Sequence, residues 1–254
     1  MLKKENVEKM KNYKMQITYD GSNYHGWQKQ ENTKQTIQGI LEKKLQEIFK
    51  QKLEIQGSGR TDAGTHANQQ VANFHIQNEF VRDEFLKTIN TILPDDIKVN
   101  EITKVDDKFH SRLSVVSKEY IYYIDLGEKA DVFTRKYKYH YPHKIDCSKM
   151  EEAKKHFLGT HDFRSFTSDK RKEKSCIRTI YDIQIERERN QISVRIHGNG
   201  FLYNMVRIIV GTLLEVGRGS VEVSEIENIM EAKERINAGQ TLPSNGLFLN
   251  KVFY

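Results

Sequence analysis

The sequence predicts an α+β fold in two halves, in which helices cover antiparallel sheets. Several short segments alternate apolar and polar residues, which is the period of half-buried strands, and longer segments between them repeat apolar residues at the helical period. These segments follow one another in a loosely similar order in each half. A chain of 254 residues can form one domain or two smaller ones, so its length alone does not decide. We expect the join near residues 106 to 117.

The residue pattern of the first half predicts two strand-helix-strand segments. Met15, Ile17 and Tyr19 alternate with polar residues, as in a half-buried strand. Thr36 precedes a segment with apolar residues on one helical face, so its hydroxyl is the expected N-cap, and Pro94 stops a second helix. The expected elements are a strand ending at Tyr19, a helix after Thr36, a strand at 71–76, a helix at about 81–92 and a strand at 97–105.

The second half repeats this plan loosely. Its clearest helical stripe runs from Leu202 to Leu214. We expect Ser148 to open a helix, with Glu151 as its capping-box partner. The expected elements are a strand near 120–126, the helix at Ser148, a hairpin with arms 181–185 and 192–196, the helix at 202–214, a short helix beginning at Ser224 and a strand at 246–253. We therefore divide the chain into an N-terminal extension (1–12), an N-terminal subdomain (13–110) and a C-terminal subdomain (111–254).

The composition favours a polyanionic partner. The formal net charge is +6 and the pI is about 9.0. No run of about 18 apolar residues occurs, and the charged N-terminus lacks the apolar core of a secretory signal. Cys147 and Cys176 are far apart and form no CxxC pair, which fits a reducing cytoplasm and argues against a zinc knuckle or a disulfide framework. We expect a cytoplasmic protein with no membrane span.

The most unusual segment is the loop 57–66, Gly-Ser-Gly-Arg-Thr-Asp-Ala-Gly-Thr-His. Its glycines allow tight turns or positive φ angles, so Asp62 can be held on a strained loop at the end of a strand. Such a placement suits a nucleophilic carboxylate. From composition alone, an ordinary glycine-rich turn with an Asx bond is the alternative. No Gly-Lys-Ser/Thr follows, as a P-loop requires, and the GxGxxG spacing of a dinucleotide-binding loop is lacking.

This loop resembles the signature Gly-Arg-Thr-Asp-Ala-Gly-x-His of the tRNA pseudouridine synthase A (TruA) family, in which the aspartate is catalytic. The other family blocks recur in order and cover nearly the whole chain from about Tyr13. They are 19–28, 109–112 with Ser114, 117–122, 159–163, 200–211 and 215–217. The sequence departs from the family pattern at 241–249 and at Ser111, where alanine is common. The first nine or so residues precede the usual family start, so Met10 is a second candidate initiator.

The resemblance implies the pseudouridine synthase fold: two ferredoxin-like halves that flank a central RNA-binding cleft, with the catalytic loop in the N-terminal subdomain. It also implies the reaction, in which uracil is detached from its ribose and rejoined through carbon, with no metal and no cofactor. The implied substrate is tRNA, at positions 38 to 40 of the anticodon stem-loop. A homodimer is expected, so that one tRNA spans both subunits.

The resemblance also assigns roles to three residues, and the position of Arg60 suggests a fourth. Asp62 matches the nucleophile, and Arg207 occupies the position that pairs with it, where a cation keeps a desolvated carboxylate ionised. Tyr120 aligns with the tyrosine that stacks on the target base and can take part in proton transfer. Arg60 lies two residues before Asp62 and, in a strand-like segment, would point the same way, toward the flipped nucleotide or its phosphate. The alternatives are a solvated cation for Arg207, a core or sheet tyrosine for Tyr120 and a structural ion pair for Arg60.

Further residues are candidates either for a structural role or for RNA contact. Those in matching motifs are Trp27, His66 and His75. We expect His161 and Asp162 to form a structural pair. The cationic run 169–174, and Lys136 and Lys138 interleaved with tyrosines, either contact phosphates or form solvated loops.

Two other functions are compatible with the sequence. One is an RNA-binding protein on the same scaffold that has lost catalysis, against which the joint presence of Asp62, Tyr120 and Arg207 argues. The other is an aspartate-dependent nucleosidase or glycosidase, which generally needs a second carboxylate near the first. The segment 57–75 contains no such companion.

Overall fold

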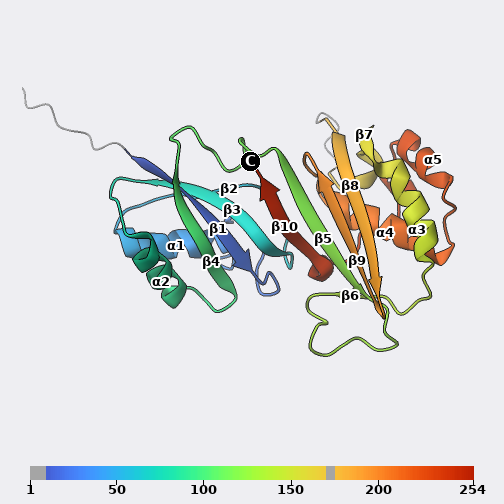
Figure 1. Ribbon diagram of the computed structural model, residues 1–254, viewed down its shortest axis with the longest axis horizontal. Helices are drawn as coiled ribbons and strands as arrows, with labels where there is room; N and C mark the ends of the chain where they lie inside the picture. The colour runs from blue at the N-terminus through green and yellow to red at the C-terminus, as the bar shows by residue number, and fades with distance from the viewer. Residues whose placement is uncertain (1–9, 170–174) are drawn as a thin grey trace, which may run out of the picture. The chain divides into compact units, whose positions relative to one another are not determined.

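The computed structural model describes residues 10–169 and 175–254, which fall into two compact units (Figure 1). Unit 1 comprises the residues up to Val115 together with Tyr254, and unit 2 comprises Val116–Phe253. The division lies within the expected join at 106–117, slightly after the expected boundary at 110/111. Residues 1–9 of the expected extension, and with them the choice between Met1 and Met10, lie outside the described residues.

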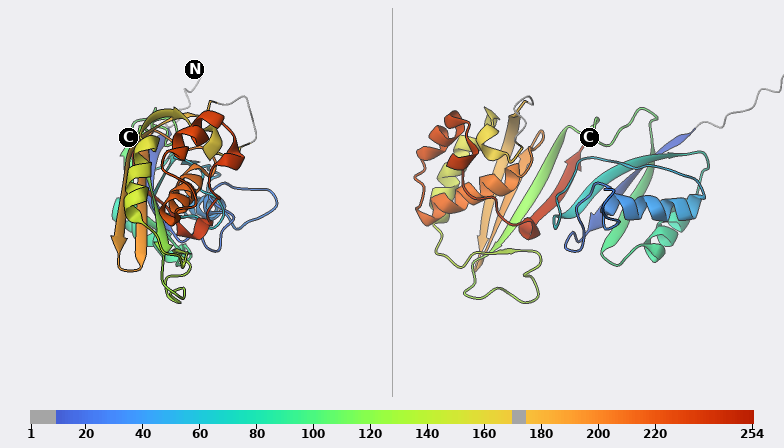
Figure 2. Two further views of the ribbon diagram at one scale, coloured as in Figure 1. Left: turned by 90° about the vertical axis from the view of Figure 1, so that its right-hand side faces the viewer. Right: turned by 180° about the vertical axis from the view of Figure 1, so that it is seen from behind.

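Unit 1 has the ferredoxin-like order of elements. Its strands are antiparallel neighbours in the order β4-β1-β3-β2, and α1 and α2 lie on one face of this sheet (Figure 2). The order is that of the βαββαβ motif. The elements are β1 (Lys11–Tyr19), α1 (Ile37–Phe49), β2 (Gln56–Gly57), β3 (His66–Ile76), α2 (Arg82–Ile92) and β4 (Ile97–Val105).

The strands, helices and helix ends predicted for unit 1 are confirmed except at the start of β3. The Thr36 side chain accepts a hydrogen bond from the Gly39 N–H and caps α1. Pro94 follows the end of α2, as expected. β3 begins at His66 rather than at residue 71, because its first half lacks apolar alternation. The fully buried Gln70 is hydrogen-bonded to Ser58 and Gly59, which satisfies a polar residue where the pattern would require an apolar one.

Unit 2 repeats the same order. Its strands run β10-β5-β9-β8 as antiparallel neighbours, and β7 extends the sheet beyond β8. The βαββαβ motif therefore occurs in both units, and the prediction of two α+β halves is confirmed. The strands and α-helices are β5 (Ser117–Asp125), β6 (Tyr139–His140), α3 (Cys147–Ala153), β7 (Gly159–Asp162), β8 (Ile177–Glu188), β9 (Gln191–Gly198), α4 (Met205–Arg218), α5 (Glu225–Ala232) and β10 (Leu247–Phe253). Short 3-10 helices lie at Lys154–Phe157, Arg164–Phe166, Arg235–Asn237 and Ser244–Gly246.

The predicted capping box of α3 is wrong. The carboxylate of Asp146, one residue before the helix, accepts a hydrogen bond from the Ser148 N–H and is the cap. Because Asp146 takes this position, Ser148 lies inside the helix, and Glu151 forms an ion pair with Lys154 instead. Ser224 precedes α5 as predicted, but its backbone is already helical and its side chain forms no cap bond. Among the described residues, no helix has the length and apolar character to cross a bilayer.

A buried polar network fixes the segment 106–111 in unit 1. Asn12 donates from Nδ2 to the carbonyls of Asp106 and Phe109, at 3.0 and 2.8 Å. Asn73 donates to Asn12 Oδ1 at 3.0 Å and accepts from the Ser111 N–H at 2.8 Å. Both asparagines are at most 1% exposed. Because buried polar groups are costly when unpaired, this network fixes one conformation of the segment.

Replacement of Asn73 by alanine should therefore destabilise unit 1. The change leaves Asn12 Oδ1 and the Ser111 N–H without their partner, and we expect the free energy of unfolding to fall by about 1 to 3 kcal/mol. Urea unfolding followed by the fluorescence of Trp27, the single tryptophan, reports on this unit. Asn78→Ala, at an exposed position, is the control. Equal losses in the two variants would contradict the role of the network.

Candidate active site

Asp62 lies in the loop between β2 and β3 and is half-buried. Its carbonyl accepts a hydrogen bond from the Thr65 N–H at 3.1 Å, which closes a tight turn. Gly64, within this turn, has a φ of +76°, a conformation that residues with a side chain rarely adopt. The turn thus presents the carboxylate on a fixed backbone.

Thr61, next to Asp62, anchors the loop in the core of unit 1. Its hydroxyl oxygen lies 2.8 Å from the hydroxyl of Tyr19, and its carbonyl accepts from the Trp27 N–H at 3.0 Å. Burial raises the pKa of Tyr19, so this phenol stays neutral as a hydrogen-bonding group. Arg60 is exposed and Asp62 half-buried on either side of the buried Thr61. This alternation is what a strand-like segment gives when two residues point away from the core.

The segment 20–28 packs against the Asp62 loop through glycines. A Cβ atom on Gly21 would lie 2.0 Å from the Thr65 carbonyl oxygen, and one on Gly26, whose φ is +86°, would lie 2.5 Å from that of Thr61. No side chain fits at such distances, so the two backbones can approach only where these residues are glycine. Two of the sequence blocks that carry the family resemblance therefore form one packed structure.

Trp27 and His66 brace this structure from inside. Trp27 is 2% exposed, and a Cβ atom on Gly57 would lie 2.5 Å from its Nε1. His66 is buried, and its Nδ1 lies 3.0 Å from the Gly21 backbone nitrogen, which donates to it. His75 is half-buried farther along β3. The first two residues support the loop rather than present a surface to a ligand.

The side chain of Arg207, at the beginning of α4, donates hydrogen bonds to Leu242 and Asn204. Its Nε donates to the Leu242 carbonyl at 2.6 Å, and its Nη1 donates to Asn204 Oδ1 at 2.7 Å. The residue is half-buried on a helix that is otherwise almost wholly buried. A cation in the first turn of a helix is disfavoured by the helix dipole, so these two bonds hold the charge where the helix alone would not.

The segment 239–242 supplies one of those two partners. A Cβ atom on Gly211 would lie 2.1 Å from the Gln240 carbonyl oxygen, and one on Gly239 would lie 2.6 Å from the Thr212 nitrogen. The segment therefore packs backbone against α4, which places the Leu242 carbonyl beside Arg207. This contact belongs to the stretch 241–249 that departs from the family pattern. Because the contact is made by a carbonyl, it does not depend on which side chain residue 242 carries.

Tyr120 lies in β5, opposite Ile196 of β9 and Leu249 of β10, and is 9% exposed. Its ring meets the ring of Phe201 edge-on, with centroids 5.2 Å apart. Phe201 belongs to the segment that leads into Asn204 and α4. Two residues along the strand, the Tyr122 hydroxyl donates to the Pro243 carbonyl at 2.6 Å. Burial raises the pKa of Tyr122, and the positive charge of Arg207 partly opposes this rise.

The four predicted site residues thus fall into two pairs. Arg60 and Asp62 share one loop of unit 1. Tyr120 and Arg207 belong to neighbouring elements of unit 2. Sequence reasoning missed Asn204 and the segment 239–242 as partners of Arg207. Asn204 lay within a quoted family block, but an asparagine before a helix reads as an ordinary cap.

The remaining candidates make structural or surface contacts. His161 and Asp162 bind different partners: the His161 ring lies 2.7 Å from the Leu158 carbonyl, and Asp162 accepts from the Arg164 N–H. The expected pair is therefore two separate contacts. Arg135 and Lys138 lie in the loop before β6, and their carbonyls accept hydrogen bonds from Asn245 of the 3-10 helix Ser244–Gly246. Residues 170–174 of the cationic run lie outside the described residues.

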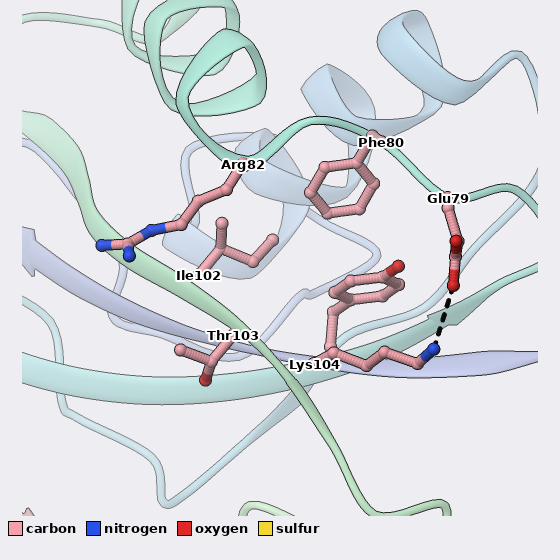
Figure 3. A pocket seen from close by; sticks show the side chains of 7 residues that line it. Glu79, Phe80, Arg82, Ile102, Thr103 and Lys104 are labelled. Atoms are coloured by element: carbon pink, nitrogen blue, oxygen red, sulfur yellow. Dashed lines mark hydrogen bonds and ion pairs between the residues drawn. The ribbon is translucent and has the colours of Figure 1, made fainter.

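A pocket of about 350 Å³ in unit 1 contains none of the predicted site residues (Figure 3). Phe80 and Ile102 form part of its wall, and Glu79 pairs with Lys104 at 2.9 Å across one side. It lies at the start of α2, away from the Asp62 loop in the sequence and in the elements that line it. In the described part of the chain, no group of three or more His, Cys, Asp or Glu residues is arranged to hold a metal ion.

Comparisons with known proteins place the chain in a family. A family model described as tRNA pseudouridine synthase matches residues 15–113 and 153–254. The tRNA pseudouridine synthase A of Acetivibrio thermocellus is 45% identical over 245 residues, which is 96% of this chain and 100% of the relative. That of Anoxybacillus flavithermus is 46% identical, covering 96% of this chain and 99% of the relative. The tRNA pseudouridine synthase A 2 of Bacillus cereus is 42% identical, with the same coverage.

Among solved structures the likeness is distant. A chain in the crystal structure of a Cbf5-Nop10-Gar1 complex is similar with a TM-score of 0.39 and 13% identity, over 93% of this chain and 48% of that chain. A likeness of this degree carries no argument about function. The family model and the full-length relatives show the family. The chain belongs to the tRNA pseudouridine synthase A family, a family of isomerases that act on tRNA.

Proposed function

We propose that the chain isomerises uridine to pseudouridine at positions 38 to 40 of the tRNA anticodon stem-loop, with Asp62 as the nucleophile. The observation that carries the proposal is the fixed, half-buried presentation of Asp62 on a turn closed by Thr65 and anchored through Thr61. A nucleophile gains from such a backbone because its carboxylate need not be ordered during the reaction. The target positions follow from the resemblance of the sequence blocks.

The reaction is balanced without a co-reactant. The bond between uracil N1 and ribose C1′ breaks, a bond between uracil C5 and C1′ forms, and the proton on C5 is replaced by one on N1. Substrate and product are isomers, so neither an oxidant nor a reductant takes part. The carboxylate can attack either C1′ or the uracil ring, and both routes require it to be ionised.

Arg207 is the proposed partner that keeps the nucleophile ionised. A desolvated carboxylate tends to protonate unless a cation lies close to it. The guanidinium of Arg207 is fixed by Asn204 and Leu242 in the first turn of α4. The amide groups that begin a helix carry partial positive charge. The guanidinium and these amide groups therefore both favour an anion near this end of α4.

Tyr120 and Arg60 are proposed to bind the target nucleotide. An aromatic ring that stacks on a flipped base recovers part of the energy lost when the base leaves its stack. The edge-on contact with Phe201 orients the ring of Tyr120 for that task. Arg60 is exposed beside Asp62 and is suited to a phosphate. The net charge of +6 supports the wider contact with RNA.

We further propose a homodimer that binds one tRNA across both subunits, in the cytoplasm, where tRNA is found. The proposed subdomains remain 13–110 and 111–254. Sedimentation of the chain with and without tRNA tests the dimer. A monomer in both conditions would contradict it.

Asp62→Asn should abolish turnover while RNA binding stays nearly intact, because one carboxylate supplies the nucleophile and many cations supply affinity. Turnover is measured as tritium released from tRNA labelled at uracil C5, and binding by filter retention. Modified positions are mapped by carbodiimide treatment and reverse transcription. Asp95→Asn, at an exposed position, is the matched control. Release by Asp62→Asn at a rate comparable to that of the control would remove the catalytic assignment.

Arg207→Lys should also lose activity, although the charge is kept. An ammonium group cannot donate in the fixed fork that reaches both Leu242 and Asn204, so the charge moves. We expect single-turnover rates to fall by about 100-fold. Arg218→Lys, exposed at the other end of α4, is the matched control. A rate within twofold of wild type for Arg207→Lys would show that the position of the guanidinium is not needed.

A further inference from the structure

We infer that Asn204 is a positioning residue, whose side chain holds the guanidinium of Arg207 in its working place. The inference rests on the proposed role of Arg207 and names the residue on which that role depends. It is carried by the contacts of the Asn204 side chain and by its backbone conformation.

The side chain of Asn204 does not cap the helix that follows it. It occupies the N-cap position of α4, where an asparagine normally accepts a hydrogen bond from a backbone N–H of the first turn. Here it forms no such bond. Its Oδ1 instead accepts from Arg207 Nη1 at 2.7 Å. A stabilising local interaction is thus replaced by one that serves a single side chain.

The backbone of Asn204 is also in a costly conformation. Its φ is +63°, in the left-handed region that residues with a side chain seldom occupy. Asparagine tolerates this region better than most residues do. Strain of this kind persists only where surrounding contacts enforce it, and it is concentrated at functional sites. The conformation turns the side chain of Asn204 toward Arg207 and Ser168.

The amide of Asn204 is itself held from the other side. Its Nδ2 donates to Ser168 Oγ at 3.0 Å, and the Ser168 N–H donates to the Tyr203 carbonyl at 3.1 Å. Since the nitrogen faces Ser168 and the oxygen faces the guanidinium, the donors and acceptors match in one orientation of the amide. The Leu242 carbonyl and Asn204 Oδ1 accept hydrogen bonds from two different nitrogens of Arg207, Nε and Nη1. Loss of the Asn204 side chain would remove the hydrogen bond that positions Nη1 of Arg207.

Asn204→Gly tests the inference without straining the fold. Glycine adopts the left-handed conformation freely and is nearly as good an N-cap as asparagine, so α4 should form normally. We expect the single-turnover rate to fall about 10- to 100-fold, since small displacements of a catalytic group have effects of this size. The Kd for tRNA and the Tm should stay close to those of wild type. Arg189→Gly is the matched control, because Arg189 also has a positive φ, of 50°, but lies in the exposed turn between β8 and β9.

A double-mutant cycle with Arg207→Ala separates positioning from general damage. If Asn204 acts only through Arg207, the double variant should be no slower than Arg207→Ala alone, within about twofold. Two results would overturn the inference and leave the proposed function standing. In the first, the single-turnover rate of the double variant is reduced by the product of the two single reductions. In the second, Asn204→Gly has the wild-type rate while Arg207→Ala is inactive. A wild-type rate for Arg207→Ala would overturn both the role of Arg207 and this inference. Absence of tritium release from the wild-type chain would overturn them together with the proposed function.

Discussion

The close backbone approach at Gly21 and Gly26 is the constraint on which the candidate site depends. At both positions a Cβ atom would overlap a carbonyl oxygen of the Asp62 loop. These contacts hold the loop against the segment 20–28. The hydrogen bonds of Thr61 and Thr65 then fix the direction of the chain through Asp62. A side chain at either glycine would push the loops apart and release the turn. The chemistry proposed for one carboxylate therefore rests on two residues that have no side chain at all.

Unit 2 places its own site residue by the same device. Gly211 and Gly239 allow the segment 239–242 to lie directly on α4, and this contact brings the Leu242 carbonyl to Arg207. Both units share the βαββαβ order, yet Asp62 lies in the loop between β2 and β3 of unit 1, whereas Arg207 lies in helix α4 of unit 2. The repeated motif thus supplies two similar scaffolds, while glycine-mediated contacts particular to each unit position the residues that differ.

The sequence predicted the elements well where local chemistry decides them and poorly where partners distant in the chain do. Thr36, the bounds of β4 and the stripe of α4 follow from propensity and periodicity. The start of β3 does not, because Gln70 is buried against Ser58 and Gly59 rather than against apolar neighbours. The glycines drew attention to the loop, but the role of Asp62 came from the family resemblance, since composition alone also fits an ordinary glycine-rich turn. The contact between Leu242 and Arg207 could not be foreseen, because a backbone carbonyl leaves no mark on the sequence.

The choice of arginine at position 207 follows from the cost of its location. A cation in the first turn of a helix is opposed by the helix dipole, by about 0.3 to 1 kcal/mol at an exposed site. Lysine would have to meet this cost with one compact ammonium group, whereas the guanidinium donates from Nε to Leu242 and from Nη1 to Asn204 at fixed angles. The same two bonds that offset the dipole also fix where the charge lies. Stability of the helix end and position of the charge proposed to assist catalysis are therefore one requirement. A substitution that keeps the charge but loses the planar guanidinium satisfies neither.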